Sequence, residues 1–364
     1  MGNNLFEDEK LLKQYYSRYG GYWRFPDMLD FCYLVNPYFN RSRIIQEMQD
    51  FFPTIVSQYP SGMAVNSNLA SECWNVKQEF IVPGNGAAEL IKALMEDVSG
   101  RIGVVRPTFE EYPNRLPDEN VVTYMPKKAD FRYDEVDLID FFGQNHVDTL
   151  LLINPDNPSG NFISMEGVYK LAEWCMQNNM RFVLDESFVD FSVGYIHNSC
   201  ISNDILEKYS NMCVMKSISK SYGVPGLRLG ILCSADVELI AKIKKQVSIW
   251  NINSFAEYFM QIYPKYREDY KHACDQFLQS REDFEKELQK IPFIHVMPSQ
   301  ANYFFLEVLP PYTAKQLCSI LLKDYNILAS ACLAKKGIEP NRYIRVAVRN
   351  HADNKKFVDA LKEL

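Results

Sequence analysis

The stretch MKSISKSYGVPGLRLG, residues 215–230, begins with the pattern of a buried strand and continues into a loop that contains glycine and proline. Ser217, Ser219 and Lys220 follow the strand, and Arg228 follows the loop. A lysine amine can form an imine with a carbonyl compound, and hydroxyl groups with a forked guanidinium can hold a phosphate ester. Taken alone, the stretch is equally compatible with a surface lysine and a structural arginine.

Pyridoxal 5'-phosphate (PLP) requires this combination of groups, because an enzyme holds it as a Schiff base on a lysine and fixes its phosphate with donors. RFVLDESFVDF places Asp185 at the end of an apolar strand, where an unpaired carboxylate would be costly to bury. A protonated pyridine nitrogen would be a suitable partner for it. A helix N-cap or an ordinary salt bridge is the alternative for Asp185.

Two glycine-containing or proline-containing turns follow other strands. INPDNPSG, residues 153–160, is a stiff turn that could present the amide of Asn157 to a phenolate oxygen. PGNGAAELI, residues 83–91, is a glycine loop that enters an amphipathic helix, so the backbone N–H groups near Gly86, Ala87 and Ala88 could bind phosphate. Each turn by itself is weak evidence for a ligand.

The order of apolar segments predicts the fold class. From about residue 78 to residue 235, short β-rich runs alternate with amphipathic helical stretches, which is typical of a mostly parallel sheet covered by helices. After residue 260 come a charged helix, a strand at ANYFFLEV and a helix opened by a capping box of Thr313 and Gln316. A chain of 364 residues exceeds the usual size of one core. We therefore predict a large α/β domain at 35–255, and a small α+β domain made of 1–34 and 256–364.

Composition excludes several classes of protein. A net charge of -7 provides no basic face for nucleic acid. No apolar run is long enough for a membrane span and the start lacks the pattern of a signal sequence, so we predict a cytoplasmic protein. Nine cysteines without a CxxC pair predict reduced thiols, and five widely spaced histidines predict no metal site.

Together, the four segments resemble the fold type I PLP enzymes, the class I/II aminotransferase superfamily, over nearly the whole chain. The resemblance implies PLP as the cofactor and an α/β fold, with a large mostly parallel sheet sandwiched by helices and a smaller α+β domain. It implies that Lys220 forms the Schiff base, that Asp185 pairs with the pyridine nitrogen and that Asn157 bonds the phenolic oxygen. Phe109, in VVRPTFEEYP, would stack on the cofactor ring.

The same resemblance assigns the remaining positions of the site. Tyr59, in SQYPSG, matches a tyrosine that reaches the phosphate of the neighbouring subunit, which implies a homodimer with a shared active site. Arg345 would grip the substrate carboxylate, and Asn36 and Arg349 would lie at the substrate cleft. The phosphate group of the cofactor would bind among Gly86, Ala87, Ala88, Ser217, Ser219 and Arg228.

Within the superfamily, the chain resembles the branch that contains histidinol-phosphate aminotransferase and threonine-phosphate decarboxylase. The decarboxylase is the more similar in GLRLG, WNIN, ANYFFLE and RYIRVAVR. Aminotransferases of this branch usually carry a tyrosine at the position of Phe188, where the decarboxylase has phenylalanine. The resemblance therefore favours decarboxylation of a small phospho-amino acid, of the threonine-phosphate or serine-phosphate type. Amino transfer is the alternative, and a non-catalytic PLP-binding module is a third possibility.

One position departs from the branch. Relatives carry an arginine near ILASACLAKK, residues 327–336, that helps to hold the substrate phosphate, and Ser330 takes its place here. Lys335, Lys336 and Arg349 are the candidates to replace that charge. A substrate without phosphate is the other explanation.

Overall fold

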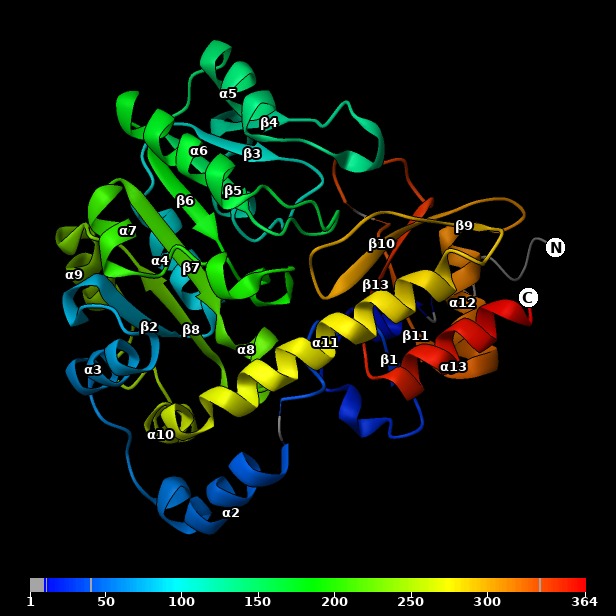
Figure 1. The fold of residues 1–364 in the computed structure, drawn as a ribbon, viewed down its shortest axis with the longest axis horizontal. Helices are drawn as coiled ribbons and strands as arrows, with labels where there is room; N and C mark the ends of the chain where they lie inside the picture. Colours follow the sequence, from blue (N-terminus) through cyan, green and yellow to red (C-terminus); the bar gives the residue numbers. More distant parts are fainter. Residues whose placement is uncertain (1–9, 11, 40, 334) are drawn as a thin grey trace.

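A seven-stranded sheet forms the centre of the larger part of the molecule (Figure 1). The computed structural model describes residues 10, 12–39, 41–333 and 335–364. Strands β7, β6, β5, β3 and β4 run parallel, and β8 is antiparallel to both β2 and β7, so the predicted mostly parallel sheet is confirmed. In sheet order the strands are β2 (Ile81–Asn85), β8 (Leu229–Cys233), β7 (Met212–Ser217), β6 (Arg181–Asp185), β5 (Thr149–Ile153), β3 (Ile102–Val105) and β4 (Val121–Tyr124).

Helices cover both faces of this sheet, which explains why its central strands are continuous apolar runs rather than alternating ones. On one face, α4 (Ala87–Asp97) and α9 (Val237–Gln246) pack their apolar stripes against the strands. On the other face, five helices contribute many of the buried side chains. These are α3 (Met63–Trp74), α5 (Glu135–Gln144), α6 (Met165–Gln177), α7 (Asn203–Lys208) and α10 (Ser254–Ile262).

A second, antiparallel sheet of four strands lies beside the first (Figure 1). Helices α12 (Ala314–Tyr325) and α13 (His351–Lys362) pack on it, and both halves of the predicted capping box at Thr313 and Gln316 are present. The strands are β12 (Ser330–Ala331), β13 (Tyr343–Ala347), β10 (Tyr303–Val308) and β9 (Ile294–Val296), with a separate parallel pair of β1 (Leu29–Asp30) and β11 (Ile327–Leu328).

Helix α11 (Arg267–Leu288) links the two parts of the molecule. In Figure 1 it begins beside α10 and extends across the second sheet. Ala273 and Cys274 belong to the core under the large sheet, whereas Phe277 and Phe284 belong to the core of the second sheet. The N-terminal segment also joins the second core, through Leu12 and neighbouring apolar residues. The domain boundary at 255–256 stays a prediction.

Two further findings concern what the described residues contain. None of the helices in the described ranges is both long and apolar enough to cross a membrane. Across the same residues, no group of three or more His, Cys, Asp or Glu side chains could hold a metal ion.

Candidate active site

Lys220 lies in the short helix α8 (Ile218–Ser221), directly after β7, at the carboxyl edge of the parallel strands. Its amine is half-buried and lies 5.9 Å from the centroid of the Phe188 ring. Burial is the main cause that lowers the pKa of Lys220 to about 8. The guanidinium groups of Arg345 and Arg228 contribute to the same decrease, while Asp185 opposes it. Roughly a tenth of the amine is therefore neutral at pH 7, and the neutral form is the one that attacks a carbonyl.

Asp185 ends β6 and is buried. The hydroxyl of Tyr112 donates to its Oδ2 at 2.7 Å, and the backbone N–H of Ser187 donates to its Oδ1 at 2.8 Å. Burial nevertheless raises the pKa of Asp185, since the hydrogen bonds and the distant Lys220 offset only part of the loss of hydration. A cationic ring nitrogen is a partner that would complete this environment.

The turn after β5 brings Asn157 against the second sheet. Asn157 is buried, and its Oδ1 accepts a hydrogen bond at 2.8 Å from Nη1 of Arg345, which lies on β13. The Arg345 guanidinium also lies over the ring of Tyr303 at 5.5 Å, and its Nε is buried without a partner in the described structure. An anion such as a substrate carboxylate could satisfy that Nε.

An anion site is built where β8 and α4 meet. A Cβ on Gly230 would lie 2.4 Å from the backbone nitrogen of Ala87, and one on Gly86 would lie 2.3 Å from Nη2 of Arg228. Only glycine therefore allows the guanidinium to cover the start of α4, whose first two residues are Ala87 and Ala88. Helix N–H groups beside a guanidinium suit a phosphate.

Two serines adjoin this anion site in sequence. The hydroxyl of Ser219 is buried and has no hydrogen-bond partner among the described residues. Ser217 is also buried, and its backbone N–H donates to Oγ of Ser187 at 3.0 Å. The unpaired hydroxyl of Ser219, the amine of Lys220 and the buried carboxylate of Asp185 suit the phosphate, the aldehyde and the ring nitrogen of PLP.

The other residues predicted for the site differ in their burial and in their contacts. Phe109 follows β3, is partly exposed and stands edge-to-face to Tyr112 at 6.5 Å. The backbone N–H of Asn36 donates to the carbonyl oxygen of Lys220 at 2.9 Å, and its buried Nδ2 has no partner in the described residues. Tyr59 is 80% exposed, and its ring lies 4.6 Å from that of Trp250.

Arg349 is engaged elsewhere. Its Nη1 donates to the carbonyl oxygen of Asp30 at 2.8 Å, and its Nε donates to Oδ2 of Asp353 at 2.9 Å. A role of Arg349 in substrate binding stays a prediction, and it would require these two bonds to be exchanged.

Sequence reasoning missed Tyr112 and Tyr303 as parts of the site. Tyr303 donates from its hydroxyl to the carbonyl oxygen of Asp156 at 2.5 Å and packs edge-to-face on Phe188 at 5.2 Å. Both tyrosines lie in segments singled out for other residues, and their full burial becomes evident only when the strands are in place.

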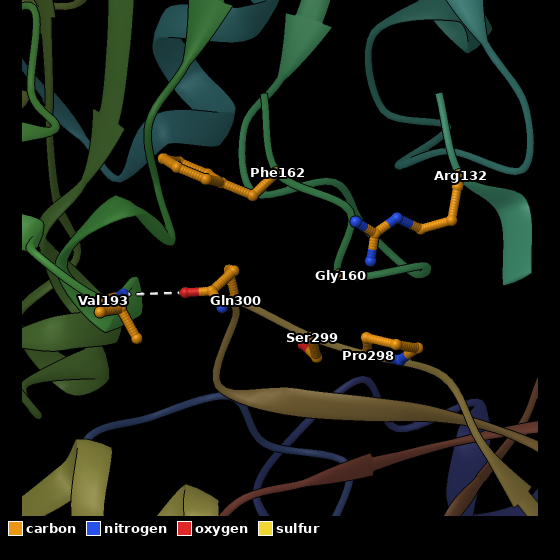
Figure 2. Close-up of a pocket in the computed structure, with 7 residues that line it drawn as sticks. All are labelled: Arg132, Gly160, Phe162, Val193, Pro298, Ser299 and Gln300. Carbon is orange, nitrogen blue, oxygen red and sulfur yellow. Dashed lines mark hydrogen bonds between the residues drawn. The ribbon is translucent and has the colours of Figure 1, made fainter. Parts of the chain in front are cut away.

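A cavity of about 330 Å³ lies at the junction of the two sheets but outside this group (Figure 2). None of the predicted site residues lines it. Figure 2 shows the side chain of Arg132 directed toward Gly160, and Oε1 of Gln300 accepting from the backbone N–H of Val193 at 2.8 Å. The lining residues are Arg132, Gly160, Phe162, Val193, Pro298, Ser299 and Gln300.

Lys220 follows β7, the buried Asp185 ends the neighbouring strand β6, and an anion site lies at the start of α4. This combination is the one expected of a PLP-dependent enzyme with the aminotransferase fold. Residues 62–361 match the family model "Aminotransferase class I and II". The chain belongs to this family, which is PLP-dependent.

Two curated relatives and one solved structure locate the chain within the family. It is 32% identical over 358 residues to "CMP-5'-(3-aminopropyl)phosphonate synthase" of Streptomyces rubellomurinus, covering 98% of this chain but only 56% of that protein. It is 31% identical over 352 residues to "L-serine phosphate decarboxylase" of Sulfurospirillum multivorans, covering 92% and 88%. The structure of a decarboxylase from Sulfurospirillum multivorans superposes with a TM-score of 0.84 at 30% identity, covering 94% and 90%.

The lowered pKa of Lys220 predicts how the apoprotein captures its cofactor. The rate of PLP capture should rise about tenfold between pH 7 and pH 9, with a midpoint near 8, because the neutral amine becomes the major form over that range. Stopped-flow absorbance measures this rate. In Arg345→Met the midpoint should move to higher pH, since the guanidinium that favours the neutral amine is gone. A midpoint near the ordinary lysine value in the unaltered protein would contradict the assignment.

Proposed function

We propose that this protein is a PLP-dependent decarboxylase of a small phospho-amino acid, of the L-serine phosphate type. Both curated relatives described above have phosphorus-bearing amines or amino acids in their names, and one is named as a decarboxylase of L-serine phosphate. Because the chain spans only 56% of the first of these relatives, the activity of that whole protein does not transfer to it. The 88% coverage of the second relative is the stronger support.

The chain's own residues would divide the work as follows. When bound, PLP supplies an electron sink for the electron pair released as a bond at the substrate α-carbon breaks. Asp185 would pair with its ring nitrogen, Asn157 with its phenolic oxygen, and the Arg228 site with its phosphate. Arg345 would orient the substrate through its carboxylate. The bond from the α-carbon to the carboxylate breaks, CO₂ leaves, and the Lys220 ammonium returns a proton to the α-carbon.

Phe188 is the observation that carries the choice of reaction. Its ring is buried, packs on Tyr303 and lies 5.9 Å from the amine of Lys220. The apolar ring offers no hydroxyl to the phenolic oxygen of the cofactor, whereas the tyrosine that the resemblance implies for aminotransferases of this branch would do so. Phenylalanine is the residue that the resemblance implies for the decarboxylase, so Phe188 supports decarboxylation.

Product analysis tests this function. The PLP-loaded protein is incubated with carboxyl-labelled L-serine phosphate, with and without a 2-oxo acid. We expect labelled CO₂ and ethanolamine phosphate in equal amounts, independent of the 2-oxo acid. Formation of a keto product that depends on the added 2-oxo acid would assign the protein to the aminotransferases instead.

We also propose that the protein acts as a homodimer. Apolar side chains are exposed along α2 (Arg41–Ser57), the turn that follows it and the loop before α10, where a second copy would cover them. This surface includes Tyr59, the residue that the family resemblance assigns to the partner's site. Its exposed members are Phe51, Phe52, Val56, Tyr59, Ile249 and Trp250.

A charge in this surface should separate the subunits. Ile249 is 77% exposed in one chain, so Ile249→Glu is expected to leave the fold intact but to shift the mass from twice 42.3 kDa to 42.3 kDa, with loss of most activity. Sedimentation velocity measures the mass. Ile196→Glu, at an exposed isoleucine outside the surface, is the control and should remain dimeric. An unaltered protein that is fully active as a monomer would contradict the shared site.

The cytoplasm is the proposed location. All nine cysteines are free thiols, and eight of them are buried. Unpaired cysteines of this kind are typical of a reducing compartment.

A further inference from the structure

Arg345 faces a small residue, Ser330, at a position where the family resemblance implies a second cation. Ser330 on β12 pairs directly with Arg345 on β13, so the two side chains share one face of the second sheet. A serine hydroxyl at this position carries no positive charge and cannot replace the guanidinium of an arginine. Any replacement cation must therefore come from another part of the chain.

Lys335 is supplied by the segment that follows β12. Its amine is half-buried and donates to the carbonyl oxygen of Thr108 at 2.5 Å, next to Phe109. A Cβ on Gly337 would lie 3.1 Å from Cβ of Arg106, so this segment packs closely on the chain that leaves β3. The amine is thus brought to the carboxyl edge of the parallel strands, where Phe109 also lies.

Lys335 has no carboxylate partner within 4 Å among the described residues. Glu110 is engaged by the guanidinium of Arg106 at 3.2 Å, and the buried Asp156 accepts from the hydroxyl of Ser159. Burial lowers the pKa of the Lys335 amine, and the nearby Arg345 guanidinium lowers it further. A partly buried amine that lies near a guanidinium and has no carboxylate partner among the described residues is a favourable place for an anion.

Lys336 and Arg349, the other two candidates to replace the missing cation, already have partners. Lys336 is exposed and lies 3.2 Å from Oδ1 of Asp118, on the outer surface. Arg349 is held by Asp353 and by the carbonyl oxygen of Asp30. Arg345 differs from Lys336 and Arg349, because its Nε is buried and has no hydrogen-bond partner among the described residues.

We propose that Lys335 and Arg345 form a two-cation site for a substrate with two anionic ends, in which Arg345 binds the α-carboxylate and Lys335 binds a phosphate ester on the side chain. This inference rests on the proposed function and deepens it, because it names the residue that distinguishes a phosphorylated substrate from its unphosphorylated counterpart. Lys335 acts here as a specificity-determining residue.

The test compares binding of O-phospho-L-serine and L-serine to the PLP-loaded protein, followed by the absorbance of the cofactor and by calorimetry. Lys335→Met keeps the length of the side chain and removes its charge. We expect it to raise Kd for O-phospho-L-serine at least tenfold and to leave Kd for L-serine within twofold. Lys336→Met is the matched control and should change neither value, and Lys335→Arg should restore most of the affinity for O-phospho-L-serine.

The outcomes separate this inference from the proposed reaction. If O-phospho-L-serine binds and depends on Lys335 but releases no CO₂, the reaction is wrong and the two-cation site stands. If CO₂ is released but Lys335→Met and Lys336→Met bind O-phospho-L-serine equally well, the site is wrong and the reaction stands. An equal loss of affinity for both ligands in Lys335→Met overturns the site too, since it indicates a general disturbance of the fold.

Discussion

Replacing Lys220 with alanine is expected to lower turnover by at least about 10³-fold, because in the proposed function Lys220 provides both the covalent link to the cofactor and the group that moves the proton. The amine is the only lysine nitrogen described in contact range of Phe188, and Asp185 and Arg345 both shift its pKa. No neighbouring lysine can replace it. Lys216 is buried, but it is held by Asp190 at 2.8 Å.

The measurement is kcat on the substrate that the unaltered protein converts, together with the visible absorbance of the bound cofactor. Lys220→Ala should still bind PLP noncovalently through the Arg228 site, with a free-aldehyde spectrum. Lys208→Ala, on the exposed side of α7, is the control and should retain full activity. Retention of more than a tenth of the activity in Lys220→Ala would exclude this lysine as the catalytic amine.

Asp185→Asn is expected to lower kcat by about 10²- to 10³-fold while preserving the shape of the site. The carboxylate is buried and receives two hydrogen bonds, from Tyr112 and from the backbone of Ser187. Asparagine keeps one oxygen to accept such a bond but carries no charge. It can therefore no longer hold a proton on the ring nitrogen of the cofactor, so the electron sink is weakened.

Tyr112→Phe provides a graded comparison for Asp185→Asn. It removes only one donor to the carboxylate, an effect of about 1–1.4 kcal/mol, which corresponds to roughly five- to tenfold in rate. Steady-state kinetics and the pH titration of the cofactor absorbance measure both variants. We predict a much larger loss of kcat in Asp185→Asn than in Tyr112→Phe. Equally small losses in the two variants would show that Asp185 has no catalytic role.

The residues that could be predicted from sequence share a position. Lys220, Asp185 and Asn157 each lie at or after the end of an apolar strand, and parallel strands bring their carboxyl ends to one edge, so three separate motifs predict one site. The glycine loop before α4 was predictable for a related reason. Gly86 and Gly230 are required by close approach of backbone and guanidinium, and glycine marks such places in a sequence.

Other features depend on distances that a sequence does not contain. Tyr112 and Asp185 are 73 residues apart and meet only because β5 lies between β3 and β6 in the sheet. Arg349 resembles a substrate residue in its motif, yet its partners Asp353 and Asp30 become evident only when β1 and α13 are in place. Lys335 could be named as one of three replacements for a missing arginine, and its contact with Thr108 distinguishes it from the other two.

The most direct test of the central claim is the identity of the lysine that carries the cofactor. The protein is purified with PLP, treated with borohydride to fix the link, digested and analysed by mass spectrometry. We predict a phosphopyridoxyl mass on Lys220, within the stretch MKSISKSYGVPGLRLG, and on no other lysine. Labelling of Lys216 or Lys335 in place of Lys220, or no labelled peptide from a protein saturated with PLP, would contradict the account.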